Sequence, residues 1–303
     1  MARHVCEPVV FHNALGSFAP ALRIGDGDTV VTETVDAWGF DKAGAARQSR
    51  PNPMTGPFFI DGAEPGDCLA VRIDRMTPNR DEGWTFGPLA PHVVDPAAVA
   101  ALPARRRVLW RLDGDKARLI DPPAALAHFE APLAPMLGCF GVAPPLGQAI
   151  STATSGAYGG NMDYRRFGPG ATAYFPVFAP GALFFLGDGH FAQGDGEIVG
   201  TGIETSFEVE FTVWVQKGRA IGWPRGETQD FLFTLGNARP LDQALQHATS
   251  EMLAWLAADY GLDGLAASHL LGQAVRYDIA NVFNPAYSVA CRMRKSVLAA
   301  LVR

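Results

Sequence analysis

The chain has 303 residues, with 31 acidic and 25 basic side chains and a formal net charge of −6. Hydrophobic residues make up 48% of it and charged residues 18%, which is typical of a globular protein and too apolar for a disordered one. The mild acidity argues against a nucleic-acid-binding surface, because such a surface needs basic groups that neutralise phosphates. The most basic run, residues 105–107, holds three arginines and is interpreted as a solvated surface patch.

Turn-forming residues are abundant. The 33 glycines and 23 prolines exceed the average share of about 12% for these two residues together, which predicts many turns and short strands. The most apolar stretch, residues 171–187, contains Pro176 and Pro180. It is therefore interpreted as two buried strands joined by a turn, and we expect no membrane-spanning segment.

The four cysteines, Cys6, Cys68, Cys139 and Cys291, have no C-x-x-C spacing, which argues against a zinc ribbon or a thioredoxin-like motif. The first eleven residues lack the apolar core of a signal peptide. We therefore expect a cytoplasmic protein with reduced thiols.

Strand patterns dominate the first two thirds of the chain. Strands are predicted at residues 21–24, 29–35, 58–60 and 68–73, and residues 107–112 and 117–120 flank a hairpin turn. Residues 207–215 alternate strictly between apolar and mostly polar side chains, as a strand with one wet face does.

The pattern changes after residue 217. A helix is predicted from Pro240 to Gly261, a second helix over residues 264–275, and a strand over residues 277–283. The sequence thus predicts a mainly β protein, with a β-rich body over residues 1–217 and a smaller α+β region over residues 218–303.

Polar side chains concentrate in residues 186–197, where Asp188, His190, Gln193, Asp195 and Glu197 are interleaved with four glycines. Apolar segments on both sides predict that this stretch is a loop between two buried strands. Carboxylates and an imidazole on such a loop suit a hard or borderline cation. A solvent-exposed polar turn is the alternative, although a hairpin needs only about two to five residues.

Weaker candidates lie elsewhere. Asn161 would donate its amide to an oxyanion or, equally, form an Asx turn. Glu33 and Asp36 stand at the exit of a predicted strand, where a lone Glu usually faces solvent. His12 lies in an apolar run, which is typical of a core histidine. Nucleotide-binding glycine motifs and the G-x-S-x-G motif are absent from the sequence, and the apolar setting of Cys139 argues against a nucleophilic thiol.

These segments resemble the acetamidase/formamidase family. Residues 187–197 (GDGHFAQGDGE) follow its pattern GDxHAAQGDGE and continue through residues 201–204 (TGIE). Residues 160–163 (GNMD), 140–144 (FGVAP), 55–57 with 62–67 (TGP, GAEPGD) and 32–36 (TETVD) are similar to further family motifs, in the family's order. Asn52 and Pro53 stand where many members have a histidine. Residues 78–135 depart from the pattern, so we expect loops there to shape the substrate pocket.

The resemblance implies hydrolysis of the C–N bond of a small, non-peptide amide. It also implies a β-sandwich body, a bound divalent metal and a homo-oligomer, either a dimer or larger. The expected partner is thus a small amide substrate, rather than a nucleic acid or a membrane.

Within this framework each candidate residue takes a role. The metal, with zinc favoured and calcium as the alternative, would be held by some of His12, Glu33, Asp36, His190 and Asp195. The general base would be Glu204 or Glu197, and Asn161 and Gln193 would orient the amide. Asp163, Gly160 and Gly194 would bind the substrate.

Two alternatives remain open from the sequence. The same site would serve a lactam or ester hydrolase, because these reactions share a tetrahedral intermediate. A non-catalytic β-sandwich binding protein, stabilised by a structural metal, would also account for the glycine- and aspartate-rich segment.

Overall fold

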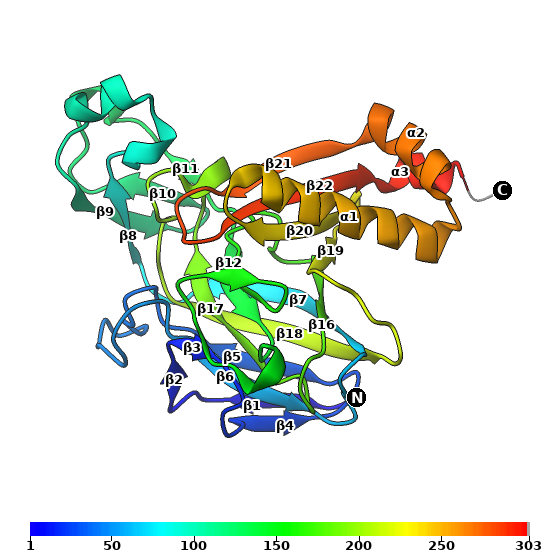
Figure 1. Cartoon of the computed structure of the whole chain (residues 1–303). Coiled ribbons are helices and arrows are strands. Elements are labelled where there is room, and N and C mark those ends of the chain that lie inside the picture. Colours follow the sequence, from blue (N-terminus) through cyan, green and yellow to red (C-terminus); the bar gives the residue numbers. More distant parts are fainter. Residues whose placement is uncertain (302–303) are drawn as a thin grey trace.

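The computed structural model describes residues 1–301, which form mainly strands, with three α-helices confined to the C-terminal part (Figure 1). The predicted mainly β class with a small C-terminal α part is confirmed. None of the helices in residues 1–301 is long and apolar enough to span a membrane.

The larger sheet has nine strands in the order β1-β5-β18-β7-β16-β19-β20-β22-β21. Their bounds are β1 Arg3–Cys6, β5 Thr29–Glu33, β18 Phe207–Gln216, β7 Cys68–Pro78, β16 Thr172–Pro176, β19 Arg225–Glu227, β20 Phe231–Ala238, β22 Tyr287–Arg294 and β21 Arg276–Asn281. The strictly alternating segment is confirmed as β18, whose apolar residues Phe207, Val209, Phe211 and Val213 are buried.

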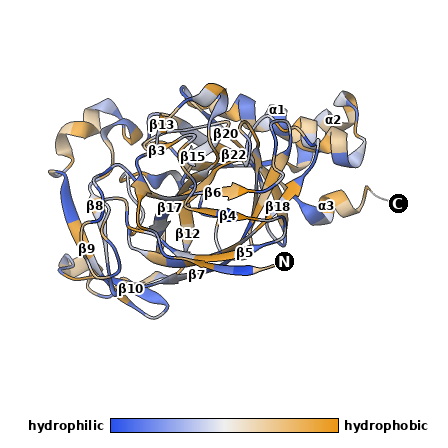
Figure 2. Cartoon of the chain, turned by 90° about the horizontal axis from the view of Figure 1, so that it is seen from below, coloured by the Kyte–Doolittle hydropathy of each residue, from blue (hydrophilic) through white to orange (hydrophobic). Residues whose placement is uncertain are grey.

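A second sheet of seven strands packs against the first. It consists of β14 Ser155–Gly156, β15 Gly159–Asn161, β12 Met136–Gly141, β17 Phe184–His190, β6 Met54–Ile60 and β2 Phe11–His12 in that order, with β4 Leu22–Ile24 paired to β6. The Phe211 ring of the first sheet lies 5.2 Å from Phe58 and 5.3 Å from Phe184 of the second, centroid to centroid. This packing makes the β-sandwich that the resemblance implies, and Figure 2 shows hydrophobic residues along β4 and β6.

Smaller elements surround the sandwich. A four-stranded sheet holds β11 Ala131–Pro132, β10 Lys116–Leu119, β9 Arg106–Asp113 and β8 Glu82–Gly87, and it contains the predicted hairpin. β13 Ile150–Ser151 pairs with β3 Ala14–Leu15. The 3-10 helices are η1 Pro91–Val93, η2 Pro96–Ala101, η3 Ala124–Leu126, η4 Pro145–Gly147 and η5 Asp195–Glu197.

The C-terminal helices form as predicted. α1 Leu241–Tyr260 follows Pro240 and ends at Gly261, whose φ of 63° is the left-handed conformation that favours glycine. α2 Gly264–Ala274 and α3 Lys295–Ala299 follow, and α1 lies over β20 and β22 (Figure 1). Strands β19 to β22, which follow residue 218, belong to the same nine-stranded sheet as strands that precede residue 217. The division of the chain into two regions at this point stays a prediction.

The prediction for residues 186–197 is partly wrong. β17 continues through His190, so the first half of the segment is strand, whereas residues 198–203 are not. A Cβ on Gly189 would lie 2.2 Å from the Phe207 ring, and one on Gly187 would lie 2.7 Å from Met54 Cε. These glycines therefore allow close packing of a strand rather than a turn.

Candidate active site

The site begins on one face of β17. Side chains alternate along a strand, so Asp188 and His190 project to the same face while Gly187 and Gly189 face the sandwich core. Isolated antiparallel bridges join Glu204 to His190 and to Trp84. As a result, His190 Nε2 lies 3.0 Å from Glu204 Oε1 and 3.5 Å from Asp188 Oδ1, and all three side chains are buried.

A glutamine fixes the orientation of the imidazole. Gln193 Nε2 donates to the Asp163 carbonyl at 2.7 Å, so the Gln193 oxygen is left to accept from His190 Nδ1 at 2.8 Å. The Nδ1 proton therefore belongs to this hydrogen bond, and Nε2 faces the carboxylates.

The carboxylates share a pattern in which one oxygen is held and the other is unpaired. Asp188 Oδ2 accepts from Asn52, Asp163 Oδ2 accepts from Asn281 and Asn284, and Glu204 Oε1 accepts from the Gly202 amide at 3.0 Å. Across residues 1–301, no hydrogen bond of acceptable geometry reaches the following buried atoms: Asp163 Oδ1, Asp188 Oδ1, Glu204 Oε2 and His190 Nε2. Each unpaired buried polar atom is costly unless a ligand satisfies it.

Asparagine side chains connect the carboxylates. Asn52 Nδ2 donates to Asp188 Oδ2 at 3.0 Å and to Asn161 Oδ1 at 2.8 Å. Asn281, at the end of β21, donates to both Asp163 and Glu197, and Asn284 donates to Asp163 at 2.7 Å. The predicted residues Asp163, Asn161 and Glu197 are thus brought to one network.

Several site residues take the left-handed backbone conformation. Asn52, Asp163, Asp188 and Glu197 have φ values of 30°, 47°, 55° and 49°. Residues other than glycine rarely adopt this region, and each such residue costs on the order of 1–3 kcal/mol. Strain of this kind concentrates where a fold must hold functional groups in place, which supports a functional role for this cluster.

Burial and like charge perturb the ionisation of the cluster. Burial, reinforced by Asp188, raises the pKa of Asp163 to about 7, and burial together with Asp163 raises the pKa of Glu197 well above its usual range. Burial raises the pKa of Glu204 to about 8, although His190 opposes it. Burial alone would lower the pKa of His190, but the charges of Glu204 and Asp188 outweigh it and raise that pKa well above its usual value.

The donor set fits a divalent cation. Asp188, His190 and Glu204 offer ligand atoms within 4.8 Å of one another, and so do Asp163, His190 and Glu197. Carboxylate oxygens repel one another, and they also repel the lone pair of an unprotonated imidazole nitrogen. A proton or a cation between these groups removes the repulsion. Nitrogen and oxygen donors suit zinc, and the excess of carboxylates is also compatible with calcium.

A cavity of about 250 Å³ opens above these groups. Asp188, Glu197, Glu204, Asn52 and Asn161 contribute to its wall, so a small molecule that enters it meets residues of the cluster. A cleft with converging polar groups and perturbed pKa values is the usual form of an active site.

Two of the predicted metal ligands lie away from the cluster. His12 stacks on Phe18 with ring centroids 4.4 Å apart, and burial lowers its pKa, so it packs as a core histidine. Glu33 Oε1 accepts from Lys42 at 2.7 Å at a partly exposed position of β5. The structure does not bring either residue to His190, which corrects the predicted ligand set.

Asp36 and Asp195 also need correction. Both oxygens of Asp36 are occupied, because Oδ1 accepts from two backbone amides and Oδ2 accepts from Arg80 and from Trp84 Nε1. Asp36 therefore positions Trp84 beside the cavity instead of binding a metal. Asp195 is half exposed and paired with Arg165, because the turn of η5 directs it to solvent while Glu197 points inward.

The predicted substrate-binding glycines differ in their surroundings. Gly160 is buried in β15, where it pairs with Phe140 and precedes Asn161. Gly194 is exposed and precedes η5. Neither residue lines the cavity above the cluster.

Three contributors, Asn52, Asn281 and Asn284, had no role assigned from the sequence, and Asp188 was recognised only as part of the polar segment. Asp188 is recognisable once β17 is read as a strand, because it is two residues from His190 on the same face. For Asn52 the one signal was the resemblance, in which Asn52 or Pro53 takes the place of a histidine. For Asn281 and Asn284 there was no local signal, since they reach the site only through the pairing of β21 with β22.

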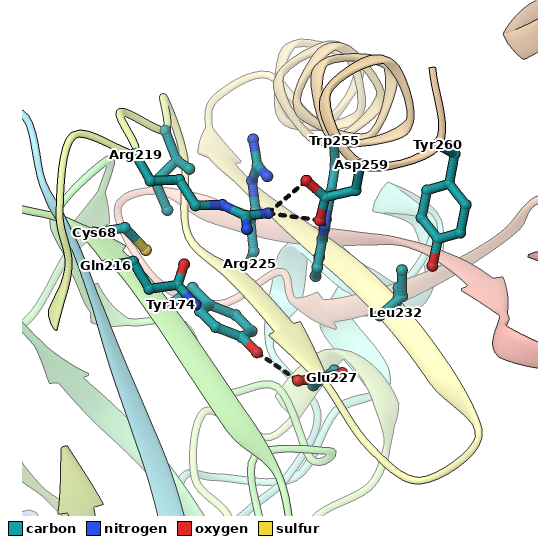
Figure 3. Close-up of a pocket in the computed structure, with 11 residues that line it drawn as sticks. Cys68, Tyr174, Gln216, Arg219, Arg225, Glu227, Leu232, Trp255, Asp259 and Tyr260 are labelled. Atoms are coloured by element: carbon teal, nitrogen blue, oxygen red, sulfur yellow. Dashed lines mark hydrogen bonds and ion pairs between the residues drawn. The ribbon is translucent and has the colours of Figure 1, made fainter. Parts of the chain in front are cut away.

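A second cavity, of about 160 Å³, lies between α1 and strands β16, β19 and β20 (Figure 3). Its charged groups are paired, either with each other or with neighbouring residues. Arg219 donates to Asp259 at 2.6 and 2.8 Å, and the Tyr174 hydroxyl donates to Glu227. This cavity therefore offers fewer free groups to a substrate than the carboxylate cluster does.

Comparisons with known proteins agree with the resemblance. Residues 11–147 and 146–241 match the model of the acetamidase/formamidase family. An acetamidase from Mycolicibacterium smegmatis is 27% identical over 244 residues, which are 62% of this chain and 59% of that protein. The chain spans roughly half the length of the curated relatives that it matches.

Solved structures align over almost the whole chain. An acetamidase from Yersinia enterocolitica has a TM-score of 0.85 at 31% identity, covering 98% of this chain and 93% of that chain. An acetamidase from Bacillus halodurans has a TM-score of 0.85 at 29% identity, covering 99% and 100%. Because the family model matches most of this chain, the chain belongs to the acetamidase/formamidase family.

Proposed function

We propose that this protein is a metal-dependent amidase that hydrolyses the C–N bond of small, non-peptide amides and releases ammonia or an amine. The observation that carries the proposal is the convergence of His190, Asp188 and Glu204, whose ligand atoms lie within 4.8 Å of one another beside an open cavity. Family membership supports the reaction class.

The chain's own groups would share the work of the reaction. Water attacks the carbonyl carbon, the C–N bond breaks, and the nitrogen leaves with a proton. A carboxyl group whose pKa is about 8, as burial makes that of Glu204, exchanges a proton efficiently near neutral pH. Glu204 would take the proton of the water and return it to the leaving nitrogen.

Orientation of the amide would fall to Asn161. Its Oδ1 accepts from Asn52, which leaves its Nδ2 to donate to the amide carbonyl in the cavity. A divalent ion bound by His190 and Asp188 would supply a Lewis acid that polarises the carbonyl and acidifies water.

The direct test measures ammonia release from formamide, acetamide and a cyclic lactam, with the metal content of the protein determined before and after chelation. We expect release that chelation abolishes and that zinc or calcium restores. Loss of thermal stability on chelation, in a metal-replete protein that hydrolyses none of the three, would instead support a structural metal.

A pair of variants separates the cluster from its surroundings. Asp188→Asn removes a charge beside His190, and we expect it to lower bound metal and ammonia release together. Asp195→Asn changes a half-exposed residue nearby, and we expect both quantities to stay at the wild-type level. Equal losses in the two variants would contradict the assignment of Asp188.

The expected homo-oligomer and the cytoplasmic location stay predictions. Sedimentation of the purified protein tests the first, and cell fractionation tests the second.

A further inference from the structure

The cavity above the carboxylate cluster is larger than a minimal amide needs. A water molecule takes up about 30 Å³ in the liquid, so about 250 Å³ exceeds the volume of an amide with four non-hydrogen atoms. Trp38, Trp84, Phe86 and Phe283 also line it, and all of these rings except the buried Trp84 are partly exposed, unlike the buried carboxylates. Trp38 lies 4.5 Å from Trp84 and 5.6 Å from Phe86, centroid to centroid, so one wall is a continuous aromatic surface.

Arg105 lies on this aromatic surface and lines the cavity. Its guanidinium carbon is 4.1 Å from the Phe86 centroid and 5.1 Å from the Phe283 centroid. One of its N–H groups donates to the Val199 carbonyl at 3.3 Å. Stacking holds the guanidinium plane and leaves other N–H groups at its edge, an arrangement that suits bidentate binding of a carboxylate.

Two further arginines add positive charge beside Trp38: Arg50, which lines the cavity, and Arg107, which does not. The guanidinium carbons of Arg50 and Arg107 are 5.6 and 5.3 Å from the Trp38 ring centroid. In the part of the chain up to Leu301, no carboxylate forms an ion pair with Arg50, Arg105 or Arg107. All three arginines of the run interpreted from the sequence as a surface patch are exposed, and of these Arg105 lines the cavity.

The cavity is thus polarised along its length. Its inner end holds the amide-hydrolysing cluster, its middle is aromatic, and its mouth is cationic. Arg105, Trp84 and Phe86 all come from residues 78–135, the segment that departs from the family pattern. The side chains that would select a substrate therefore come from a segment in which this chain differs from the family pattern.

We propose, on the basis of the amidase function above, that the substrate is a small amide with an apolar spacer and a carboxylate at its far end. The amide lies at Asn161 and Glu204, the spacer lies against Trp84 and Phe86, and Arg105 holds the carboxylate. Arg105 is a specificity-determining residue in this arrangement, since it does not contact the reacting atoms.

The test compares ammonia release from oxamate, malonamate, succinamate and glutaramate with release from the methyl ester of each, and from acetamide. We expect one chain length to be preferred, with kcat/KM for the acid at least about tenfold above that for its ester, as a charge-assisted contact provides. This acid-to-ester ratio should fall at least about tenfold in Arg105→Ala and less in Arg105→Lys.

Arg106→Ala is the matched control, because Arg106 is an adjacent arginine that does not line the cavity. It should keep the wild-type ratio. A wild-type ratio near one at every chain length, or the same ratio in wild type and Arg105→Ala, overturns the carboxylate assignment while leaving the amidase function intact.

Binding separates this proposal from the function on which it rests. Succinate and glutarate are titrated calorimetrically into wild type and Arg105→Ala, with at least about tenfold weaker binding expected in the variant. If no amide releases ammonia but this difference holds, the amidase function fails and the carboxylate site stands. If neither dicarboxylate binds and no acid is hydrolysed, the carboxylate site is wrong.

Discussion

Gly202 leaves no room for a methyl group beside the imidazole of His190. A Cβ built on Gly202 would lie 2.4 Å from His190 Nδ1 and 2.5 Å from its Cγ. The same residue donates its backbone N–H to Glu204 Oε1 at 3.0 Å. Gly202 therefore sets the spacing between the two groups that the proposed reaction depends on.

Gly202→Ala is expected to displace the His190 ring and break its hydrogen bond to Gln193. We expect a loss of bound metal and at least about a hundredfold lower kcat/KM on acetamide, because small displacements of reacting groups have effects of this size. Overpacking should lower the free energy of unfolding by about 1–3 kcal/mol. Metal analysis, steady-state kinetics and urea unfolding check these outcomes.

The matched control is Gly272→Ala on α2, where an added Cβ meets nothing within 4 Å. This variant should keep its metal and activity and gain slight stability, because alanine favours the helix. A fully active, metal-replete Gly202→Ala enzyme would show that His190 tolerates the displacement, and the proposed role of its position would then be wrong.

Gln193→Ala tests the fixed tautomer of His190. Without the Gln193 oxygen, the Nδ1 proton has no partner and the ring is free to turn, so Nε2 no longer faces Asp188 and Glu204 reliably. We expect metal affinity to fall about 10–100-fold, as is typical when a partner of a ligating histidine is removed. Competition with a chelator of known affinity measures this, and Gln193→Glu, which retains the acceptor, should bind metal better than Gln193→Ala. Equal affinities in Gln193→Ala and wild type would contradict the positioning role.

Much of the fold could be predicted because its local patterns are strong. Strict alternation identified β18, and Pro240 and Gly261 bracketed α1 within one residue of its bounds. β17 was harder, because Gly187 and Gly189 have the composition of a turn. Glycine is needed at these positions because Met54 and Phe207 pack closely against them in the folded protein. The local sequence pattern does not reveal these contacts.

The candidate site was predicted where its residues are close in sequence. Asp188, His190, Gln193 and Glu197 all come from one motif, whereas Asn281 ends β21 and Asn284 lies in the turn after it, far along the chain. Asp36 was expected to bind the metal because it lies in a segment that resembles a family motif. The side chains that donate hydrogen bonds to it, Arg80 and Trp84, lie more than forty residues away in sequence. Partner identity at such separations depends on strand pairing, which a single sequence does not specify.

The ion pair of Arg225 in β19 and Glu251 in α1 connects this helix to the sheet. Arg225 Nε donates to Glu251 Oε1 at 2.6 Å, and both side chains are only 5% exposed. Arg225 also lies 5.0 Å from the Trp255 ring centroid (Figure 3). Glu251→Ala would leave a buried, unpaired guanidinium, and we expect it to lower the free energy of unfolding by about 3–5 kcal/mol in urea titrations.

The comparison variant for Glu251→Ala is Asp61→Ala, which removes an exposed pair with Arg23 and should change stability by less than about 1 kcal/mol. Arg225→Met combined with Glu251→Leu should recover most of the loss, because neither charge is then buried alone. A single Glu251→Ala variant as stable as the Asp61→Ala variant would refute the expectation.

Asp28 anchors the N-terminal strand. Its carboxylate accepts from the Ala2 amide at 2.6 Å, from His4 Nε2 at 2.9 Å and from the Gly25 amide at 2.9 Å. These hydrogen bonds, the one from Ala2 foremost, lower its pKa from 3.8 to about 2. They therefore stabilise the folded state only while the carboxylate is ionised.

A group whose pKa is lower in the folded than in the unfolded protein contributes its full stability above the unfolded value and loses it as the pH falls towards the folded value. Asp28→Asn should therefore lower the urea midpoint at pH 7, and the difference from wild type should shrink between pH 4 and about pH 2. Asp26→Asn, a neighbouring aspartate with a single backbone partner in Val215, should show a smaller difference at pH 7. A wild-type advantage over Asp28→Asn that stays constant from pH 7 to about pH 2 would mean that the carboxylate charge does not hold this strand.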